Sequence, residues 1–269
     1  MEERKYNIPS EKITAAMLEA GKIMLSAHNI EENKDAVHAK PGTANFVTVF
    51  DVKVQNFLIS RFSEILPEAS FLAEEKDNSD ASRCGCCFCI DPIDGTTNFI
   101  HDMRASSISV GLLYDGEVVF GAIYDPYNGE LFTAEKGKGA YLNSKRISVS
   151  AHGMENALIG IGVSPYYKDT LCDRTFDIIK KCFLSCADIR RGGSAAIDLS
   201  ALACGRLDGF FECILSPWDY AAGSIIIKEA GGMITDFDGN PLDMYKPCPV
   251  VAATPAVYVK MKEIIDSTK

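Results

Sequence analysis

The stretch that most constrains the fold of this 269-residue chain is CCFCIDPIDGTTNF, residues 86–99. The side chains before Pro92 alternate as they do in a β-strand, and Pro92 cannot donate a hydrogen bond to a strand ladder. Gly95 can adopt the positive φ of a sharp turn. The pattern therefore predicts a strand whose end carries two aspartates, Asp91 and Asp94.

Two aspartates beside such a turn suit the binding of a metal and an anion. The backbone N–H groups of Gly95, Thr96 and Thr97 fall at a turn or helix start, where unpaired donors can hold a phosphate. Neighbouring carboxylates could bind the cation that accompanies this anion. Taken alone, Asp-x-x-Asp-Gly is also typical of a plain polar turn, because Asp and Gly are common turn formers.

Two further acidic positions adjoin apolar runs. Glu74 and Glu75 come directly after the run SFLA, and Asp219 follows Trp218 at the start of an apolar segment that ends at Ala230. Each has an ordinary structural interpretation, since a glutamate pair is often solvated and an aspartate often caps a helix. The residues alone leave both interpretations open.

Hydrophobic periodicity predicts a mixed α/β chain. Between Ser106 and Glu135, alternating residues with turns at 115–116 and 128–129 predict an antiparallel meander. Helical spacing predicts helices from Ser10 as N-cap, from Asp51 to the residue before Pro67, at 171–183, at 198–204, from Asp219 to Ala230 and from near Pro255. No linker or repeat is visible, so we expect one layered domain over residues 1–269, with subregions of roughly 1–150 and 151–269.

The formal net charge of −10 disfavours nucleic acid and anionic membranes as partners, because both require clustered Lys and Arg. No apolar run approaches the ~20 residues of a membrane helix, and residues 1–12 lack the apolar core of a signal peptide. We therefore expect a cytoplasmic protein with reduced cysteines. An acidic protein that handles phosphate also needs a cation between the two.

The motifs resemble those of the inositol monophosphatase family, whose fingerprints are DPIDGTTNF and WD-x-A-x-G followed by EAGG. The first stands at residues 91–99, and the second lies within residues 218–232 as WDYAAG and EAGG. Similarity extends from Lys40 to the C-terminus through NFVTVFD, FLAEE and GSAAIDLSALACGRLDGFFE. The resemblance implies the α/β fold of inositol monophosphatases and fructose 1,6-bisphosphatases, an αβαβα sandwich of alternating helix and mixed-sheet layers.

The resemblance also implies a cluster of two or three magnesium ions, and four carboxylates would offset the charge of two ions. The ligands would be Glu74, Asp91, Asp94, Asp219 and the carbonyl group of Ile93. Thr96 and Asp51 would form a hydrogen-bonded pair that, with Glu74, orients and deprotonates the attacking water. Asp51 has a rival role as a helix N-cap. Lys40, near the metals, and Glu75 are further candidates.

Substrate contacts follow from the same resemblance. They would come from Asp94, Gly95, Thr96, Ser194, Ala195, Glu212 and Asp219. Glu212 would accept hydrogen bonds from substrate hydroxyls, so that inositol monophosphate is selected and hydrolysed to inositol and phosphate. A lithium-sensitive, homodimeric phosphatase is therefore expected.

Other functions stay open at this point. Related families use the same metal motif on fructose 1,6-bisphosphate, histidinol phosphate or 3′-phosphoadenosine nucleotides. A scaffold that binds a protein partner is the non-enzymatic alternative.

Four closely spaced cysteines need a separate explanation. Cys84, Cys86, Cys87 and Cys89 are too tightly spaced for one tetrahedral zinc site. We expect free thiols, buried or half-buried, on the strand that leads to Asp91.

Overall fold

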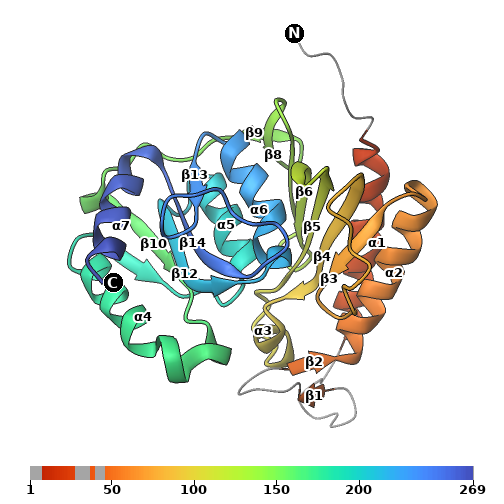
Figure 1. The fold of residues 1–269 in the computed structure, drawn as a ribbon, viewed down its shortest axis with the longest axis horizontal. Helices are drawn as coiled ribbons and strands as arrows, with labels where there is room; N and C mark the ends of the chain where they lie inside the picture. The colour runs from red at the N-terminus through yellow and green to blue at the C-terminus, as the bar shows by residue number, and fades with distance from the viewer. Residues whose placement is uncertain (1–7, 28–36, 40–45, 269) are drawn as a thin grey trace.

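The computed structural model describes residues 8–27, 37–39 and 46–268. Helices and sheets alternate in five layers, as Figure 1 shows: two helices, a seven-stranded sheet, two helices, a five-stranded sheet and two more helices. The predicted αβαβα sandwich is therefore confirmed.

The larger sheet contains the predicted meander. Its strands follow chain order: β3 (Ser70–Ala73), β4 (Cys86–Asp94), β5 (Ser107–Tyr114), β6 (Glu117–Asp125), β7 (Glu130–Glu135), β8 (Gly139–Leu142) and β9 (Lys145–Ile147). All neighbours are antiparallel except β3 and β4. The β5–β6 turn has φ of 49° at Asp115 and 81° at Gly116, as a tight hairpin turn requires.

The strands of the smaller sheet were not located from the sequence, although the predicted sandwich implied a second sheet. Its order is β11-β10-β12-β14-β13, formed by β10 (Leu158–Ile161), β11 (Asp188–Arg190), β12 (Gly209–Leu215), β13 (Met233–Thr235) and β14 (Cys248–Ala253). Strand β10 runs parallel to β11 and β12, whereas β14 is antiparallel to β12 and β13. A separate short pair joins β1 (Val37–Ala39) to β2 (Phe46–Thr48).

Each predicted helix is present, but most begin earlier than the sequence indicated. The long helices are α1 (Ser10–Leu25), α2 (Val49–Ile65), α4 (Lys168–Phe183), α5 (Ala195–Ala203), α6 (Pro217–Glu229) and α7 (Pro255–Asp266). Short turns are α3 (Thr96–Ile100), η1 (Met154–Asn156) and η2 (Pro165–Tyr167). The prediction of Ser10 as N-cap was wrong, because Pro9 holds that position and Ser10 is the first helical residue.

The two inner helices, α5 and α6, bury their side chains against both sheets. Helix α6 lies very close to the large sheet at Gly121, where an added Cβ would be 2.6 Å from the carbonyl oxygen of Ala222. Helices α1 and α2 cover the other face of that sheet, while α4 and α7 pack outside the small sheet. The close approach of α6 fixes the height of its N-terminus above the strands.

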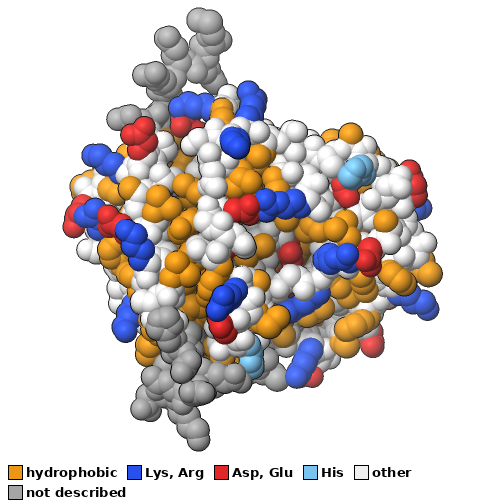
Figure 2. Space-filling model, turned by 180° about the vertical axis from the view of Figure 1, so that it is seen from behind, with side chains coloured by type: hydrophobic (Ala, Val, Ile, Leu, Met, Phe, Trp, Pro, Cys, Tyr) orange, Lys and Arg blue, Asp and Glu red, His pale blue; other side chains and the backbone are white. Residues whose placement is uncertain are grey.

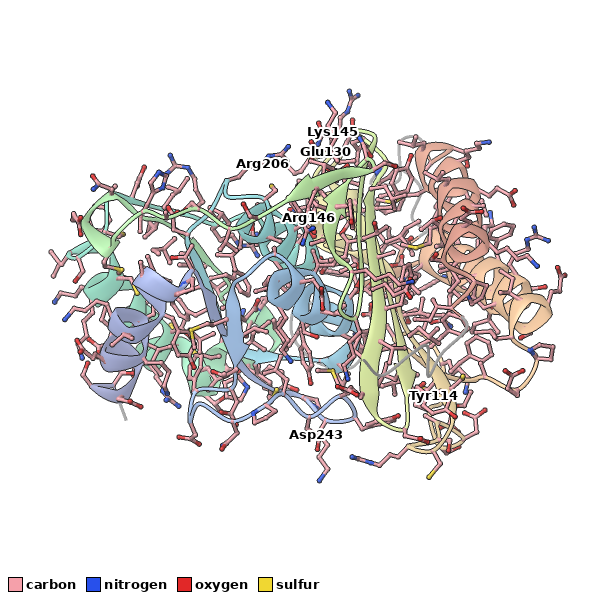
Figure 3. All side chains as sticks on the ribbon, turned by 90° about the horizontal axis from the view of Figure 1, so that it is seen from above. Tyr114, Glu130, Lys145, Arg146, Arg206 and Asp243 are labelled. Atoms are coloured by element: carbon pink, nitrogen blue, oxygen red, sulfur yellow. The ribbon has the colours of Figure 1, made fainter. Side chains whose placement is uncertain are left out.

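Exposed charges on this scaffold are mixed in sign. On the face in Figure 2, Lys and Arg side chains lie interspersed with Asp and Glu. Figure 3 shows Arg206 beside Glu130 at one end of the large sheet, where the guanidinium group donates two hydrogen bonds of 2.6 and 2.5 Å to the carboxylate. Among the described residues, no helix has both the length and the apolar character to cross a membrane.

The cysteines near Asp91 are free thiols, as expected. Cys87 and Cys89 are buried in β4 and Cys86 is half-buried, as expected, whereas Cys84 is exposed and precedes the strand, so the expected burial was wrong for Cys84. Burial raises the pKa of the Cys89 thiol well above its ordinary value. The buried side chains of Cys87 and Cys89 therefore contribute to packing of the strand that carries Asp91 and Asp94.

Candidate active site

The end of β4 carries Asp91 and Asp94 through an irregularity in the sheet. Asp91 pairs with Ser109 and Asp94 with Ser107, so two residues of β4 face one of β5. This bulge, which contains Pro92, lets the strand continue to Asp94 rather than stop at the proline. Gly95 then adopts φ 87°, as predicted, and α3 begins.

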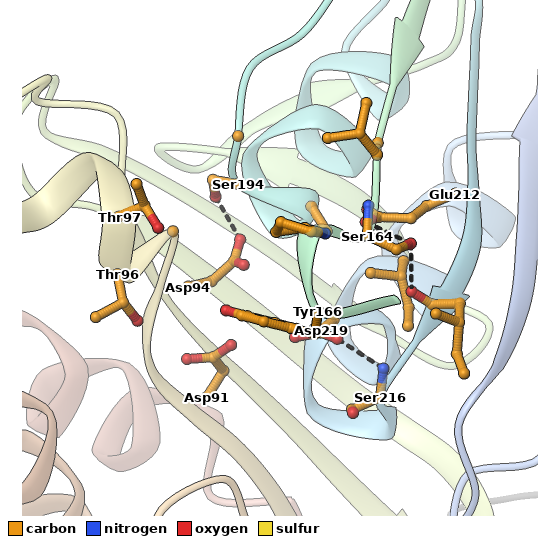
Figure 4. A pocket seen from close by; sticks show the side chains of 18 of the residues that line it. Asp91, Asp94, Thr96, Thr97, Ser164, Tyr166, Ser194, Glu212, Ser216 and Asp219 are labelled. Atoms are coloured by element: carbon orange, nitrogen blue, oxygen red, sulfur yellow. Dashed lines mark hydrogen bonds between the residues drawn. The ribbon is translucent and has the colours of Figure 1, made fainter. Parts of the chain in front are cut away.

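Three aspartates from distant segments converge at this point, as Figure 4 shows. Asp91 and Asp94 come from β4, and Asp219 comes from the first turn of α6. Each offers a carboxylate oxygen, and these oxygens all lie within 4.8 Å of one another. Carboxylate oxygens at such spacing suit a hard divalent cation.

Every aspartate of this cluster has one oxygen tied to nearby backbone. The Ile93 N–H donates to Oδ1 of Asp91 at 3.0 Å, and the Ser216 N–H donates to Oδ2 of Asp219 at 2.7 Å. Oδ2 of Asp94 accepts from the Ser194 hydroxyl and, at 2.7 Å, from the Ala196 N–H. Each carboxylate is thus oriented, and its second oxygen can face a metal.

The N-terminus of α5 supports Asp94 electrostatically. Ser194 caps this helix, and its Oγ also accepts from the Ile197 N–H at 3.3 Å. Free N–H groups and the helix dipole favour negative charge at this end. Ser194 and Ala195, predicted as substrate contacts, line the same pocket as Asp94, Gly95 and Thr96.

Asp51 lies at a different position of α2 than the sequence suggested, and it also contacts Thr96. It is not the N-cap of α2: Thr48 holds that position, and Asp51 at N3 completes a capping box by accepting from the Thr48 N–H at 2.8 Å. Its other oxygen accepts a 3.4 Å hydrogen bond from the Thr96 hydroxyl. The Thr96 hydroxyl also lies 3.2 Å from the carbonyl oxygen of Ile93. The pair expected from the resemblance is therefore present.

Asp219 also occupies position N3 of a capping box and is not the N-cap that the sequence suggested. Helix α6 begins at Pro217, Ser216 is its N-cap, and Asp219 closes a capping box from N3. Glu74 lines the pocket but lies outside the tight group of three aspartates. The backbone N–H of Glu75 donates to Gln55 at 2.8 Å, which anchors this loop to α2. Lys40 lies outside the described residues.

Glu212 stands on the opposite wall of the pocket, in β12. It is only 9% exposed, so it is not a solvated strand-end residue. Its Oε1 accepts from the Ser164 N–H at 2.8 Å and from the Ser164 hydroxyl at 3.0 Å. A Cβ at Gly162 would lie 2.0 Å from Oε2, so only glycine leaves room for this carboxylate.

Several pocket residues had no role in the sequence-based interpretation. Ser164, Tyr166, Arg191 and Asp198 line the cavity with the predicted residues. Asp198 lies on α5, and a Cβ at Gly192 would be 2.4 Å from its Oδ1. Asp198 lies in the segment GSAAIDLS, which resembles the inositol monophosphatase family, and this resemblance could have indicated it as a site residue. Tyr166 and Arg191 carried no motif.

Without bound cations, burial and mutual repulsion disfavour ionisation of the carboxyl groups in this pocket. Burial, then the neighbouring carboxylates, raise the pKa of Asp91 and Asp219 well above the ordinary range of an aspartate. Burial raises the pKa of Asp51 to about 6. Burial also raises the pKa of Asp198 and of Glu212 to about 7 each. Bound cations would reverse this effect.

These shifts predict that the metal-free protein loses stability as the pH rises from about 4 to about 7. The folded state keeps protons that unfolded carboxylates have released, so each deprotonation in this window favours unfolding. Melting temperature in excess chelator should therefore fall across the window, and magnesium should oppose the fall most at the alkaline end, where its ligands are ionised. Asp198→Asn should show a shallower fall. A flat or rising profile in the chelated wild type would contradict this assignment.

Comparison with known proteins agrees with this architecture. A model of the inositol monophosphatase family matches residues 8–268. The chain is 38% identical to Nus factor SuhB of Escherichia coli K12 over 211 residues, 78% of this chain and 79% of the relative.

Solved structures agree as well. Extragenic suppressor protein SuhB of Bartonella henselae superimposes with a TM-score of 0.87 and 32% identity, covering 95% of this chain and 97% of that one. An IMPase of Thermotoga maritima gives a TM-score of 0.85 and 29% identity over 96% of each chain. With both the family model and the fold in agreement, this chain belongs to the inositol monophosphatase family.

Proposed function

We propose that this phosphatase-family protein hydrolyses inositol monophosphate to inositol and phosphate, with magnesium as its cofactor. The observation that carries the proposal is the set of three aspartates whose carboxylate oxygens lie within 4.8 Å of one another, each carboxylate being oriented by hydrogen bonds from the protein. A set of ligands made only of oxygen atoms favours magnesium over softer metals.

The donor set fits two or three magnesium ions. Asp91, Asp94 and Asp219 would hold them, with Glu74 and the carbonyl group of Ile93 as further ligands at the edge of the pocket. Magnesium bound there would supply Lewis-acid chemistry, lowering the pKa of a water and drawing charge from the phosphoryl group. It would also remove the repulsion that the bare carboxylates exert on a phosphate dianion.

Water and phosphate would be oriented by residues of β4, α3 and α2. The Thr96 hydroxyl, held between Asp51 and the Ile93 carbonyl, can pass a proton toward Asp51. Asp51 is poised to receive it, because its pKa is raised to about 6 by burial. Thr96 and Thr97 line the pocket at the start of α3, where the first N–H groups of a helix have no partner within the helix, and these groups could bind the phosphate.

Glu212 supports the choice of a polyol. With Oε1 engaged by Ser164, its Oε2 can accept hydrogen bonds from substrate hydroxyls. A substrate without hydroxyl groups would bury this oxygen unpaired. The pocket, a cavity of about 450 Å³, is large enough for a monophosphorylated ring. Fructose 1,6-bisphosphate, histidinol phosphate and 3′-phosphoadenosine nucleotides are the competing substrates.

The remaining proposals follow from family membership. We expect a cytoplasmic, lithium-sensitive homodimer that binds neither nucleic acid nor membranes. Relatives named Nus factor SuhB make a role outside catalysis the second candidate. A partner-binding descendant would not need an intact acidic cluster, whereas all four predicted acidic ligands are present here.

The first test removes one charge from the metal cluster. Asp219→Asn keeps the side-chain shape and the carbonyl oxygen that accepts from Ser216, but it lowers the charge on the cluster. We expect phosphate release to fall by orders of magnitude, because magnesium and the phosphoryl group both lose an ionic contact. Asp173→Asn, on the exposed face of α4, is the matched control and should act like wild type. Full activity of Asp219→Asn at limiting magnesium, or of wild type in excess chelator, would refute the metal mechanism.

The second test concerns substrate choice. Glu212→Gln retains one acceptor oxygen for Ser164 but loses the charge that attracts substrate hydroxyls. The ratio of kcat/KM for inositol 1-phosphate over p-nitrophenyl phosphate should fall about tenfold or more, since hydrogen bonds to charged groups are worth roughly 1.5–3 kcal/mol. An unchanged ratio, or a wild-type preference for nucleotide phosphates, would refute the polyol assignment and leave the metal chemistry intact.

A further inference from the structure

Tyr166 approaches the acidic cluster from the wall opposite β4. It lies in η2, the short turn after β10, and lines the pocket with the three aspartates. Figure 4 shows its ring extending across the pocket, with the hydroxyl group toward Asp91 and Asp94. Four carboxylates, those of Glu74, Asp219, Asp91 and Asp94, act electrostatically on this hydroxyl group.

The hydroxyl group of Tyr166 hydrogen bonds to no residue that the structure describes, although its ring reaches deep into a polar pocket. The residue as a whole is 47% exposed, so core packing does not explain its position. A phenol keeps its proton near neutral pH, because its ordinary pKa is about 10. The group is therefore an available hydrogen-bond donor beside the cluster.

The backbone that carries Tyr166 is held in a strained but well-anchored turn. Ser164 adopts φ 42°, a left-handed conformation that is uncommon for a residue with a side chain. Three hydrogen bonds hold it: two reach Glu212, and its hydroxyl also lies 3.2 Å from the Ile214 carbonyl oxygen. The Tyr167 N–H then donates to the Ser164 carbonyl oxygen at 2.9 Å. Strain retained beside a pocket commonly serves function.

A phosphoryl group bound at the cluster would also face the pocket wall that η2 forms. Thr96 and Thr97 of α3 would lie on the β4 side of it, and the aspartates would hold the cations. The outer side faces η2, where Tyr166 is the side chain that crosses the pocket. Phosphate oxygens are strong acceptors, and a neutral donor there adds no repulsion.

We propose that the Tyr166 hydroxyl donates a hydrogen bond to the substrate's phosphoryl group and that its ring closes the outer side of the pocket. This inference rests on the proposed phosphatase function and adds to it a substrate-contacting residue supplied by η2. Glu212, through Ser164, then anchors the turn that carries the phosphate contact. One carboxylate thereby links the polyol end of the pocket to the phosphate end.

The test replaces only the hydroxyl group. Tyr166→Phe is compared with wild type and with Tyr141→Phe, a control on β8 whose hydroxyl donates to the Lys138 carbonyl oxygen at 3.0 Å. Orthophosphate binding to the magnesium-loaded protein can be followed by fluorescence of Trp218, the single tryptophan, which lines the pocket. Magnesium affinity is measured separately from the melting temperature at increasing metal concentration.

We expect Tyr166→Phe to weaken orthophosphate binding about tenfold and to lower kcat/KM for p-nitrophenyl phosphate by roughly 10- to 100-fold, with magnesium affinity unchanged. Tyr141→Phe should match wild type in all three measurements. Orthophosphate affinity within twofold of wild type would overturn the proposal, as would a loss confined to magnesium affinity. Absence of orthophosphate binding by the wild type would overturn it as well.

If the proposed phosphatase function were wrong, the result would differ from the outcomes that would overturn the role of Tyr166. In that case the wild type hydrolyses no phosphomonoester although it binds orthophosphate with magnesium. The comparison of orthophosphate affinities then still decides the role of Tyr166.

Discussion

Repulsion between carboxylates that share one buried pocket is the constraint on which the rest of this structure depends. Three aspartates offer oxygens within 4.8 Å of one another, with Glu74, Asp198 and Glu212 nearby. Left in water, such groups would separate. The protein opposes this by fixing one oxygen of each aspartate with backbone N–H groups. Preorganisation of this kind reduces the reorganisation needed when metal and phosphate bind.

The layered fold supplies these fixed positions from three separate segments. The bulge in β4 directs Asp91 and Asp94 to one side, and the N-termini of α5 and α6 point at the same place. Because α6 contacts the large sheet at Gly121 without an intervening side chain, Asp219 is held at a defined height above β4 and β5. The small sheet contributes the opposite wall, with Glu212 on β12 and Tyr166 just after β10. The aspartates of β4 and the carboxylate of Glu212 therefore come from different sheets.

Local patterns in the sequence allowed part of this to be predicted. The strand before Asp91, the positive φ of Gly95 and the β5–β7 meander each depend on neighbouring residues, and all are present. Helix starts at Asp51 and Asp219 were placed too late, because an aspartate at N3 of a capping box resembles an N-cap in sequence. The small sheet, with its short strands and crossover pairing, left little periodic signal. Tyr166 was missed because only tertiary structure brings η2 to the aspartates.

The central claim is that the carboxylates of Asp91, Asp94 and Asp219 bind divalent cations. Anomalous X-ray scattering from crystals grown with manganese, as a visible substitute for magnesium, tests it most directly. The account predicts two or three manganese peaks in the pocket, with these aspartates as ligands at about 2.0–2.3 Å, and a weaker set in Asp219→Asn. Saturating manganese that leaves the pocket without a peak, or that binds only elsewhere on the surface, would contradict it.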